Sequence, residues 1–219
     1  MREVCSINLL FPVLNERLRL QSGIERTMSY LKENVDIPYQ VTILDNGSTD
    51  ETPEIAKVLE EKYAEEMRQK FPQAEGILKE IKSRYEYENE EYKILVPDTL
   101  IDIVKEGRAL HHCAGSSERY FDRIESRETY ICFLRRKEAP GIPFYTIEVE
   151  PGGTIRQHRS YLDEEPGIEQ IREFLKKWQK VIRKRLTEED KKLARISKIK
   201  REANIEELKA KNNTRVLQG

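Results

Sequence analysis

The first third of the chain alternates short apolar runs with segments of helical periodicity. The short, mainly apolar runs at 5–11 and 41–44 are typical of buried parallel strands. Apolar side chains recur at helical spacing over 24–31, and a further helix is predicted from about 53 to 63. This order predicts a βαβα fragment in which a right-handed crossover joins two parallel strands.

The pattern changes after the first third. Residues 67–91 carry a thin apolar stripe among many Glu, Lys and Tyr residues, which predicts a charged helical connector. A short strand is predicted at 92–96, followed by a helix that starts near Leu100 and stops at Gly107. The His-His-Cys sequence at 111–113 is then predicted to lie on the next helix.

Three segments rich in β-forming residues predict an antiparallel sheet. They lie at 129–134, 143–149 and 154–159, and a Pro-Gly-Gly sequence between the last two predicts a hairpin. With the run at 92–96, the sheet is expected to have three or four strands. Alternation along the strands predicts one polar face, carrying Glu148, Glu150, Arg156 and His158.

A long helical segment at 168–208 closes the chain, and its apolar stripe is expected to cover the sheet. The predicted fold is therefore α+β: an N-terminal βαβα half-Rossmann-like fragment, then a small antiparallel sheet packed on helices, with a long basic C-terminal helix. The expected parts are the fragment at 1–66, the connector at 67–91, an α+β domain at 92–186 and a basic helical tail with a disordered end at 187–219.

Charge is distributed unevenly along the chain. Hydrophobic residues make up 37% and charged residues 36% of the sequence, and the net charge is −1. Residues 1–66 carry 7 basic and 13 acidic side chains, whereas residues 180–219 carry 13 basic and 6 acidic ones. A basic tail fits contact with nucleic acid, although the two oppositely charged ends could also attract each other.

Cysteine usage and hydropathy indicate the compartment. The three cysteines, Cys5, Cys113 and Cys132, are odd in number and far apart, so no disulfide framework is expected. The chain lacks a run of about 18 apolar residues, and its start does not resemble a signal peptide. We therefore expect a cytoplasmic protein with no membrane association.

Two segments near the start resemble the nucleotide-sugar-binding half of dolichyl-phosphate mannose synthase-type glycosyltransferases. They are the Phe-Pro-Val-Leu-Asn-Glu sequence at 11–16 and the stretch at 41–50. The resemblance implies that Pro12, Glu16 and Asp45 bind the nucleotide of a nucleotide-sugar. The metal-binding Asp-x-Asp of that family has no counterpart after residue 66, so transferase activity is not expected. A simpler reading makes Asp45 part of a turn and helix cap.

A second set of motifs resembles the PcfJ-like family over about residues 77–186. The first motif is His-Cys-x-Gly, with His112, Cys113 and Gly115, and Tyr120 follows nearby. A Phe-Tyr-Thr-Ile-Glu strand comes next, and then an Ile-x-Gln-x-Arg stretch with Ile155, Gln157 and Arg159. A closing helix carries Trp178. Members of this family occur on conjugative plasmids and integrative elements. The resemblance implies an accessory protein of a mobile genetic element.

His112, Cys113 and His158 form the candidate catalytic set. If the sheet packs on the histidine-bearing segment, His158 could act as a base toward a Cys113 thiolate. The alternative is a buried cysteine and a hydrogen-bonded histidine that lock the helix to the sheet. Adjacent histidines on a helix point about 100° apart, so no metal site is expected.

Glu148, Gln157 and Arg159 form a candidate polar site on the sheet. The paired N–H donors of arginine and a side-chain amide suit the binding of a small ligand or a phosphodiester. The alternative interpretation of these residues is a solvated sheet face with cross-strand ion pairs. The favoured function is a non-enzymatic accessory protein that needs no cofactor, contacts nucleic acid through its tail and meets other conjugation proteins. The alternatives are a glycosyltransferase remnant that binds a nucleotide-sugar and a Cys/His-dependent hydrolase.

Overall fold

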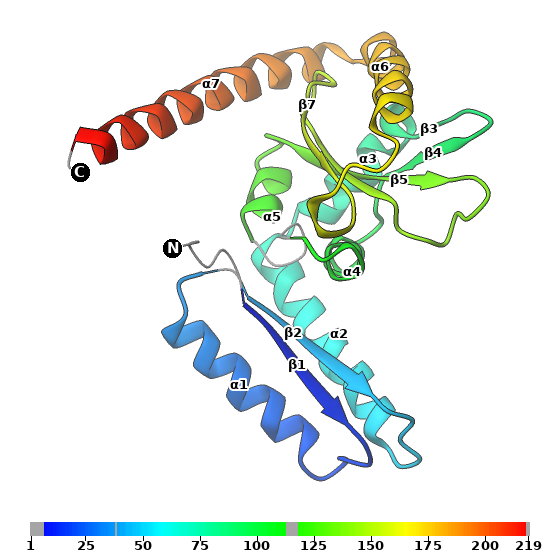
Figure 1. Ribbon diagram of the computed structural model, residues 1–219, viewed down its shortest axis with the longest axis vertical. Coiled ribbons are helices and arrows are strands. Elements are labelled where there is room, and N and C mark those ends of the chain that lie inside the picture. Colours follow the sequence, from blue (N-terminus) through cyan, green and yellow to red (C-terminus); the bar gives the residue numbers. More distant parts are fainter. Residues whose placement is uncertain (1–6, 38, 113–117, 218–219) are drawn as a thin grey trace.

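The computed structural model describes residues 7–37, 39–112 and 118–217 (Figure 1). This part of the chain is a mixed α+β structure with seven α-helices and two small sheets. The strands are β1 (Ile7–Val13), β2 (Tyr39–Asp45), β3 (Tyr87–Glu88), β4 (Tyr92–Leu95), β5 (Tyr130–Arg136), β6 (Tyr145–Val149) and β7 (Ile155–Arg159). The helices are α1 (Leu20–Asn34), α2 (Thr52–Lys70), α3 (Ala74–Tyr85), α4 (Leu100–Leu110), α5 (Glu118–Glu125), α6 (Ile168–Arg185) and α7 (Glu188–Leu217).

The first four elements form the expected β1-α1-β2-α2 unit. β1 pairs in parallel with β2, from Ile7 opposite Tyr39 to Val13 opposite Asp45. Helices α1 and α2 enclose a small apolar cluster in which Val13, Leu20, Ile24 and Leu59 are buried. The cluster is small because only two strands and two helices contribute to it, so the unit depends on further contacts for its stability.

The second sheet is antiparallel throughout, with the strand order β3-β4-β5-β6-β7. It has five strands rather than the expected three or four, because the short strand β3 pairs with β4 at the edge. The predicted hairpin joins β6 to β7. Gly153 adopts a φ of 77° in its turn, a left-handed conformation that favours glycine.

Helix α3 lies in the main apolar core rather than in a connector between two units. Ile77, Leu78 and Ile81 are at most 2% exposed. The carbonyl of Tyr85, at the end of this helix, accepts a 2.6 Å hydrogen bond from the indole of Trp178 in α6. The burial of α3 was not predicted from the sequence, because its apolar stripe is thin and the rest of the helix is charged. The expected boundary at residue 66 falls inside the continuous helix α2.

Two predicted helix boundaries were wrong. Gly107 is buried within α4, which continues to Leu110. The helix ends at His111, whose left-handed backbone (φ 53°) lets its amide reach the last helical carbonyls. His111 and His112 therefore follow a helix instead of lying on one. Cys113 is outside the described residues.

The predicted helix at 168–208 is two helices. The chain leaves helical geometry at Leu186, and Thr187 then caps α7. The Thr187 hydroxyl accepts from the Asp190 amide at 3.1 Å, while the Asp190 carboxylate accepts from the Thr187 amide at 2.8 Å. This reciprocal capping satisfies two backbone donors at the start of the helix.

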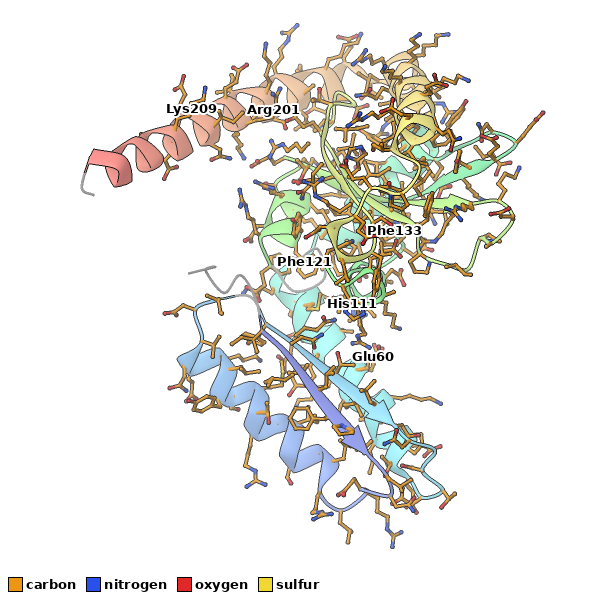
Figure 2. The ribbon with its side chains drawn as sticks, viewed as in Figure 1. Glu60, His111, Phe121, Phe133, Arg201 and Lys209 are labelled. Carbon is orange, nitrogen blue, oxygen red and sulfur yellow. The ribbon has the colours of Figure 1, made fainter. Side chains whose placement is uncertain are left out.

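Helix α7 extends away from the sheet, and Lys209 lies on the projecting part (Figure 2). Its 30 residues correspond to a length of about 45 Å. Across the described residues, no helix combines the length and apolar character needed to cross a membrane.

The burial of α3 yields a direct stability prediction. The substitution Leu78→Ala is expected to lower the free energy of unfolding by about 2–5 kcal/mol, because it leaves a cavity in the core. The matched change Val58→Ala, at a helical side chain that is 69% exposed, should alter it by less than about 0.5 kcal/mol. Urea titrations of both variants measure the difference. Equal, small effects would show that α3 is outside the core.

Candidate functional site

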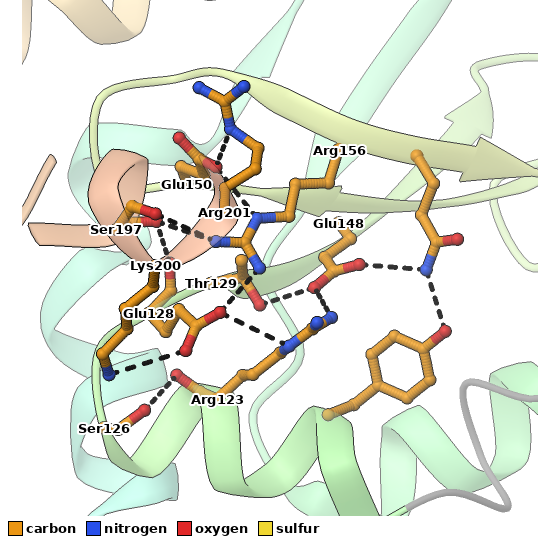
Figure 3. A network of polar contacts seen from close by, with 12 residues as sticks. Arg123, Ser126, Glu128, Thr129, Glu148, Glu150, Arg156, Ser197, Lys200 and Arg201 are labelled. Atoms are coloured by element: carbon orange, nitrogen blue, oxygen red, sulfur yellow. Dashed lines mark hydrogen bonds and ion pairs between the residues drawn. The ribbon is translucent and has the colours of Figure 1, made fainter. Parts of the chain in front are cut away.

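A network of largely buried polar side chains joins the second sheet to helices α5 and α7 (Figure 3). We call it the sheet network. Its members are Tyr120, Arg123, Glu128, Thr129, Glu148, Glu150, Arg156, Gln157, Ser197, Lys200 and Arg201. A register irregularity between Glu148 and Val149 allows consecutive side chains of β7 to reach the same polar face.

Glu148 is the centre of one half of the network. It is 3% exposed and accepts hydrogen bonds from Arg123 at 2.6 Å, Thr129 at 2.8 Å and Gln157 at 3.0 Å. The Gln157 amide also donates to the Tyr120 hydroxyl at 2.8 Å. Glu148 and Gln157 are therefore in direct contact. Two of their partners, Arg123 and Tyr120, come from α5.

Glu150 and Arg156 form the other half. The Arg156 guanidinium donates to Glu150 at 2.9 Å and to Glu128 at 2.7 Å. Helix α7 completes this half, since Arg201 donates to Glu150 at 2.7 Å and Ser197 contacts Arg156 at 3.2 Å. Although burial opposes it, the adjacent Arg156 holds the pKa of Glu128 below its ordinary value.

The charges of the sheet network compensate one another. Three carboxylates meet three arginines and one lysine, and each carboxylate contacts at least one arginine. Removing one member of such a buried set leaves an uncompensated charge, which is strongly destabilising. The arrangement thus fixes α5 and α7 to the sheet, and it explains why these charged side chains are buried.

His112 packs against the sheet next to this network. Its Nε2 atom lies 2.9 Å from the Thr146 hydroxyl of β6. Burial lowers the pKa of His112, with Asp163 acting in the opposite direction. The imidazole is therefore neutral at neutral pH and acts as a hydrogen-bonding contact between the end of α4 and the sheet.

His158 lies on the opposite face of the sheet from His112. It pairs in register with Ile147, and its ring lies beside that of Tyr145, with the ring centroids 6.0 Å apart. Tyr145 and Thr146 are consecutive in β6, so their side chains leave the sheet on opposite faces. The expected placement of His158 on the face of Glu148 was wrong, and the two histidines do not share a site.

Arg159, which was predicted to join the polar site, has another partner, as does Arg135 of β5. Arg159 is half-exposed and donates to Glu165 at 3.2 Å. Arg135 is buried and forms a two-fold ion pair with Glu106 of α4. Burial raises the pKa of Glu106, while Arg135 opposes that shift. These contacts hold α4 and the loop after β7 to the sheet.

The three residues matched to the glycosyltransferase pattern make local contacts at the loop ends of β1 and β2. The Asp45 carboxylate accepts from the Ser48 amide at 3.1 Å, as expected for a turn. The Glu16 carboxylate accepts from Arg19 at 2.8 Å. Pro12 is exposed on the outer face of the sheet. A nucleotide site here remains a prediction.

Helix α6 carries a second polar feature, on the side away from its buried stripe. We call it the basic ridge. It consists of the exposed side chains Lys176, Lys177, Lys180, Arg183 and Lys184. Within the described residues, none of these five forms an ion pair with a carboxylate. The ridge spans about 12 Å along the helix, given the rise per residue.

The lysines in the first half of α7 differ in this respect. Lys191 pairs with Glu188 at 2.6 Å, and Lys198 pairs with Glu202 at 3.8 Å. The ridge thus differs from the first half of α7 in that its cations are unpaired, although the sequence pointed to the tail. Among the described residues, no group of three or more His, Cys, Asp or Glu side chains is placed to hold a metal ion.

Comparison with known proteins gives one family. The family model described as "PcfJ-like protein" matches residues 28–175, more than half of the chain. An uncharacterised protein of Listeria innocua, Lin1253/Lin1744, is 34% identical over 87 residues. That match covers 40% of this chain and 18% of the Listeria protein, so the chain spans less than a fifth of its relative. No solved structure matches.

The sheet network predicts a measurable coupling between Glu150, which directly follows β6, and α7. In a double-mutant cycle of Glu150→Gln and Arg201→Gln, we expect a coupling of about 1–2 kcal/mol in the free energy of unfolding, because the carboxylate is buried. The matched cycle of Lys198→Gln and Glu202→Gln, an exposed pair in α7, should give less than about 0.5 kcal/mol. A coupling below that value in the first cycle contradicts the docking of α7.

The lowered pKa of His112 predicts a pH dependence. Because its pKa is lower in the folded chain, the unfolded chain binds the proton first as the pH falls below about 6.5. Stability therefore falls as the pH falls through this range. His112→Gln removes this contribution, so the stability lost through the substitution should be larger at about pH 7.5 than at about pH 5.5. Chemical denaturation at the two pH values tests this. An equal loss at both would contradict it.

Proposed function

This chain belongs to the PcfJ-like family, and we propose that it is a non-enzymatic accessory protein that contacts nucleic acid through the basic ridge of α6. The observation that carries the proposal is the set of five exposed cations without carboxylate partners. Lysine and arginine side chains in this state gain free energy by replacing the counterions of a phosphate backbone. The ridge supplies no base-reading pattern, so the expected contact is independent of sequence.

The geometry of the ridge supports this contact. Lys176, Lys180 and Lys184 follow one another at intervals of four residues and therefore lie along one side of α6. The opposite side is held by Trp178 and Ile182, which are fully buried. Because the helix is fixed to the core, its backbone needs no reordering when the flexible lysine side chains meet a phosphate backbone.

The first half of α7 is a less suitable surface. Ser197 and Arg201 of α7 are engaged with the sheet network, and several lysines of this helix are already paired. The resemblance to plasmid-borne and integrative-element proteins supports a role in a mobile genetic element. The mutual compensation of charges in the sheet network supports a structural rather than a catalytic use of those residues.

The proposal predicts the effect of neutralising the ridge. The triple variant Lys176→Gln/Lys180→Gln/Lys184→Gln is expected to bind a fluorescently labelled DNA duplex at least tenfold more weakly at low salt. The slope of log affinity against log salt should fall by about 2–3, since about 0.9 is lost per phosphate contact on duplex DNA. Fluorescence anisotropy over a salt series measures both quantities.

A matched control removes the same charge from α7. The variant Lys191→Gln/Lys192→Gln/Lys198→Gln changes three lysines that pair with Glu188, Glu189 and Glu202. Its affinity should remain within about twofold of the unmodified chain. Equal losses in the two triple variants would assign binding to overall charge, and wild-type affinity in the ridge variant would refute the proposal.

A further inference from the structure

A pocket of about 860 Å³ lies between the β1-α1-β2-α2 unit and the helices α4 and α5. Figure 2 labels Glu60 of α2 and Phe121 of α5, which line it from the two sides. Two ion pairs connect the sides: Lys105 with Glu60 at 3.4 Å, and Lys70 with Glu118 at 2.5 Å. Its volume falls within the range of about 300–1,000 Å³ that is usual for small-molecule sites.

The walls of the pocket are mainly apolar. Ile24 and Met28 of α1, Val41 of β2, Val104 of α4 and Phe121 of α5 contribute to them. Water in such a pocket finds few hydrogen-bonding partners, so an apolar ligand body that replaces it gains free energy. Pro12, Glu16 and Asp45, the residues implied to bind a nucleotide, are not among the lining residues, so this pocket is separate from the loops at Asp45.

The polar groups at the rim favour an anion. Four carboxylates line the pocket, and three of them are already paired with lysines: Glu60 with Lys105, Glu66 with Lys32, and Glu118 with Lys70. Three lining cations, Lys57, Arg108 and Arg119, have no carboxylate partner in the described part of the chain. After pairing, the pocket therefore has an excess of positive charge.

Arg108 is the most informative of these cations. Its Nε atom is fully buried and lacks a hydrogen-bond partner among the described residues. A buried guanidinium nitrogen without an acceptor is costly, and an anionic oxygen that enters the pocket beside Arg108 would satisfy it after a small shift of the side chain. Tyr39 and Tyr63 add hydroxyl groups to the lining, and burial raises the pKa of both, so they remain protonated donors.

We propose that this pocket binds a small anionic amphiphile, with an apolar body between α1, β2 and α4 and a single acidic head group at Arg108. The apolar walls select the body, and the unpaired guanidinium selects the head group. The ligand contacts both sides of the pocket, so its binding also stabilises the junction between the N-terminal unit and the rest of the protein. The assignment is independent of the nucleic-acid contact at α6.

Two fluorescent probes separate the apolar and the charged contribution. 1-Anilinonaphthalene-8-sulfonate carries an acidic group, whereas N-phenyl-1-naphthylamine has the same ring skeleton without it. The full chain is expected to bind one molecule of the sulfonate saturably. Arg108→Met should weaken sulfonate binding about tenfold and change binding of the neutral probe by less than twofold, since it removes a charged hydrogen bond.

Three further variants keep the test decisive. Ile101→Trp fills the pocket and should weaken both probes at least tenfold, whereas Arg119→Gln at the rim should weaken the sulfonate alone, by twofold or more. Arg172→Met, at an exposed arginine of α6, is the charge-matched control and should change neither. Cooperative unfolding is verified for each variant.

Absence of saturable one-to-one binding, or insensitivity of both probes to Ile101→Trp, would overturn the site. Equal responses of the two probes to the arginine variants would overturn the anionic ligand class.

Discussion

The rest of the structure depends on one contact, in which Trp178 of α6 packs against α3 and the second sheet. The side chain is fully buried, and its indole donates a 2.6 Å hydrogen bond to the carbonyl of Tyr85. This bond satisfies both the indole and an end-of-helix carbonyl in an apolar environment. This contact fixes the rotation of α6 about its own axis, so its lysines face outward. The chain then enters α7 above the polar face of β7.

Buried charge has a structural role in the same region. Glu148 and Glu150 would be costly on an apolar sheet face, yet arginines from α5, β7 and α7 compensate them. The apolar core therefore fixes α3 and α6, whereas the sheet network fixes α5 and the first half of α7. Figure 3 shows how closely these two helices and the strands meet.

Much of the fold could be predicted from the sequence because its signals are local. Alternation and the Gly-Gly turn located the β6–β7 hairpin, and two apolar runs located the parallel pair β1–β2. Features that depend on distant partners were not predictable. The burial of α3 depends on Trp178, 93 residues from Tyr85. Arg123, the charged partner of Glu148, comes from α5, and no sequence pattern linked the two residues. The placement of His158 was wrong because simple alternation ignores the register irregularity in β6 and β7.

The packed core holds α6 so that its basic ridge faces outward. Hydrogen–deuterium exchange of the full chain, with and without a DNA duplex, tests the role of this surface most directly. We expect slower exchange on DNA binding in peptides that contain residues 176–184, while the part of α7 beyond Arg201 is unchanged. Slower exchange confined to the distal part of α7, with α6 unaffected, would contradict it.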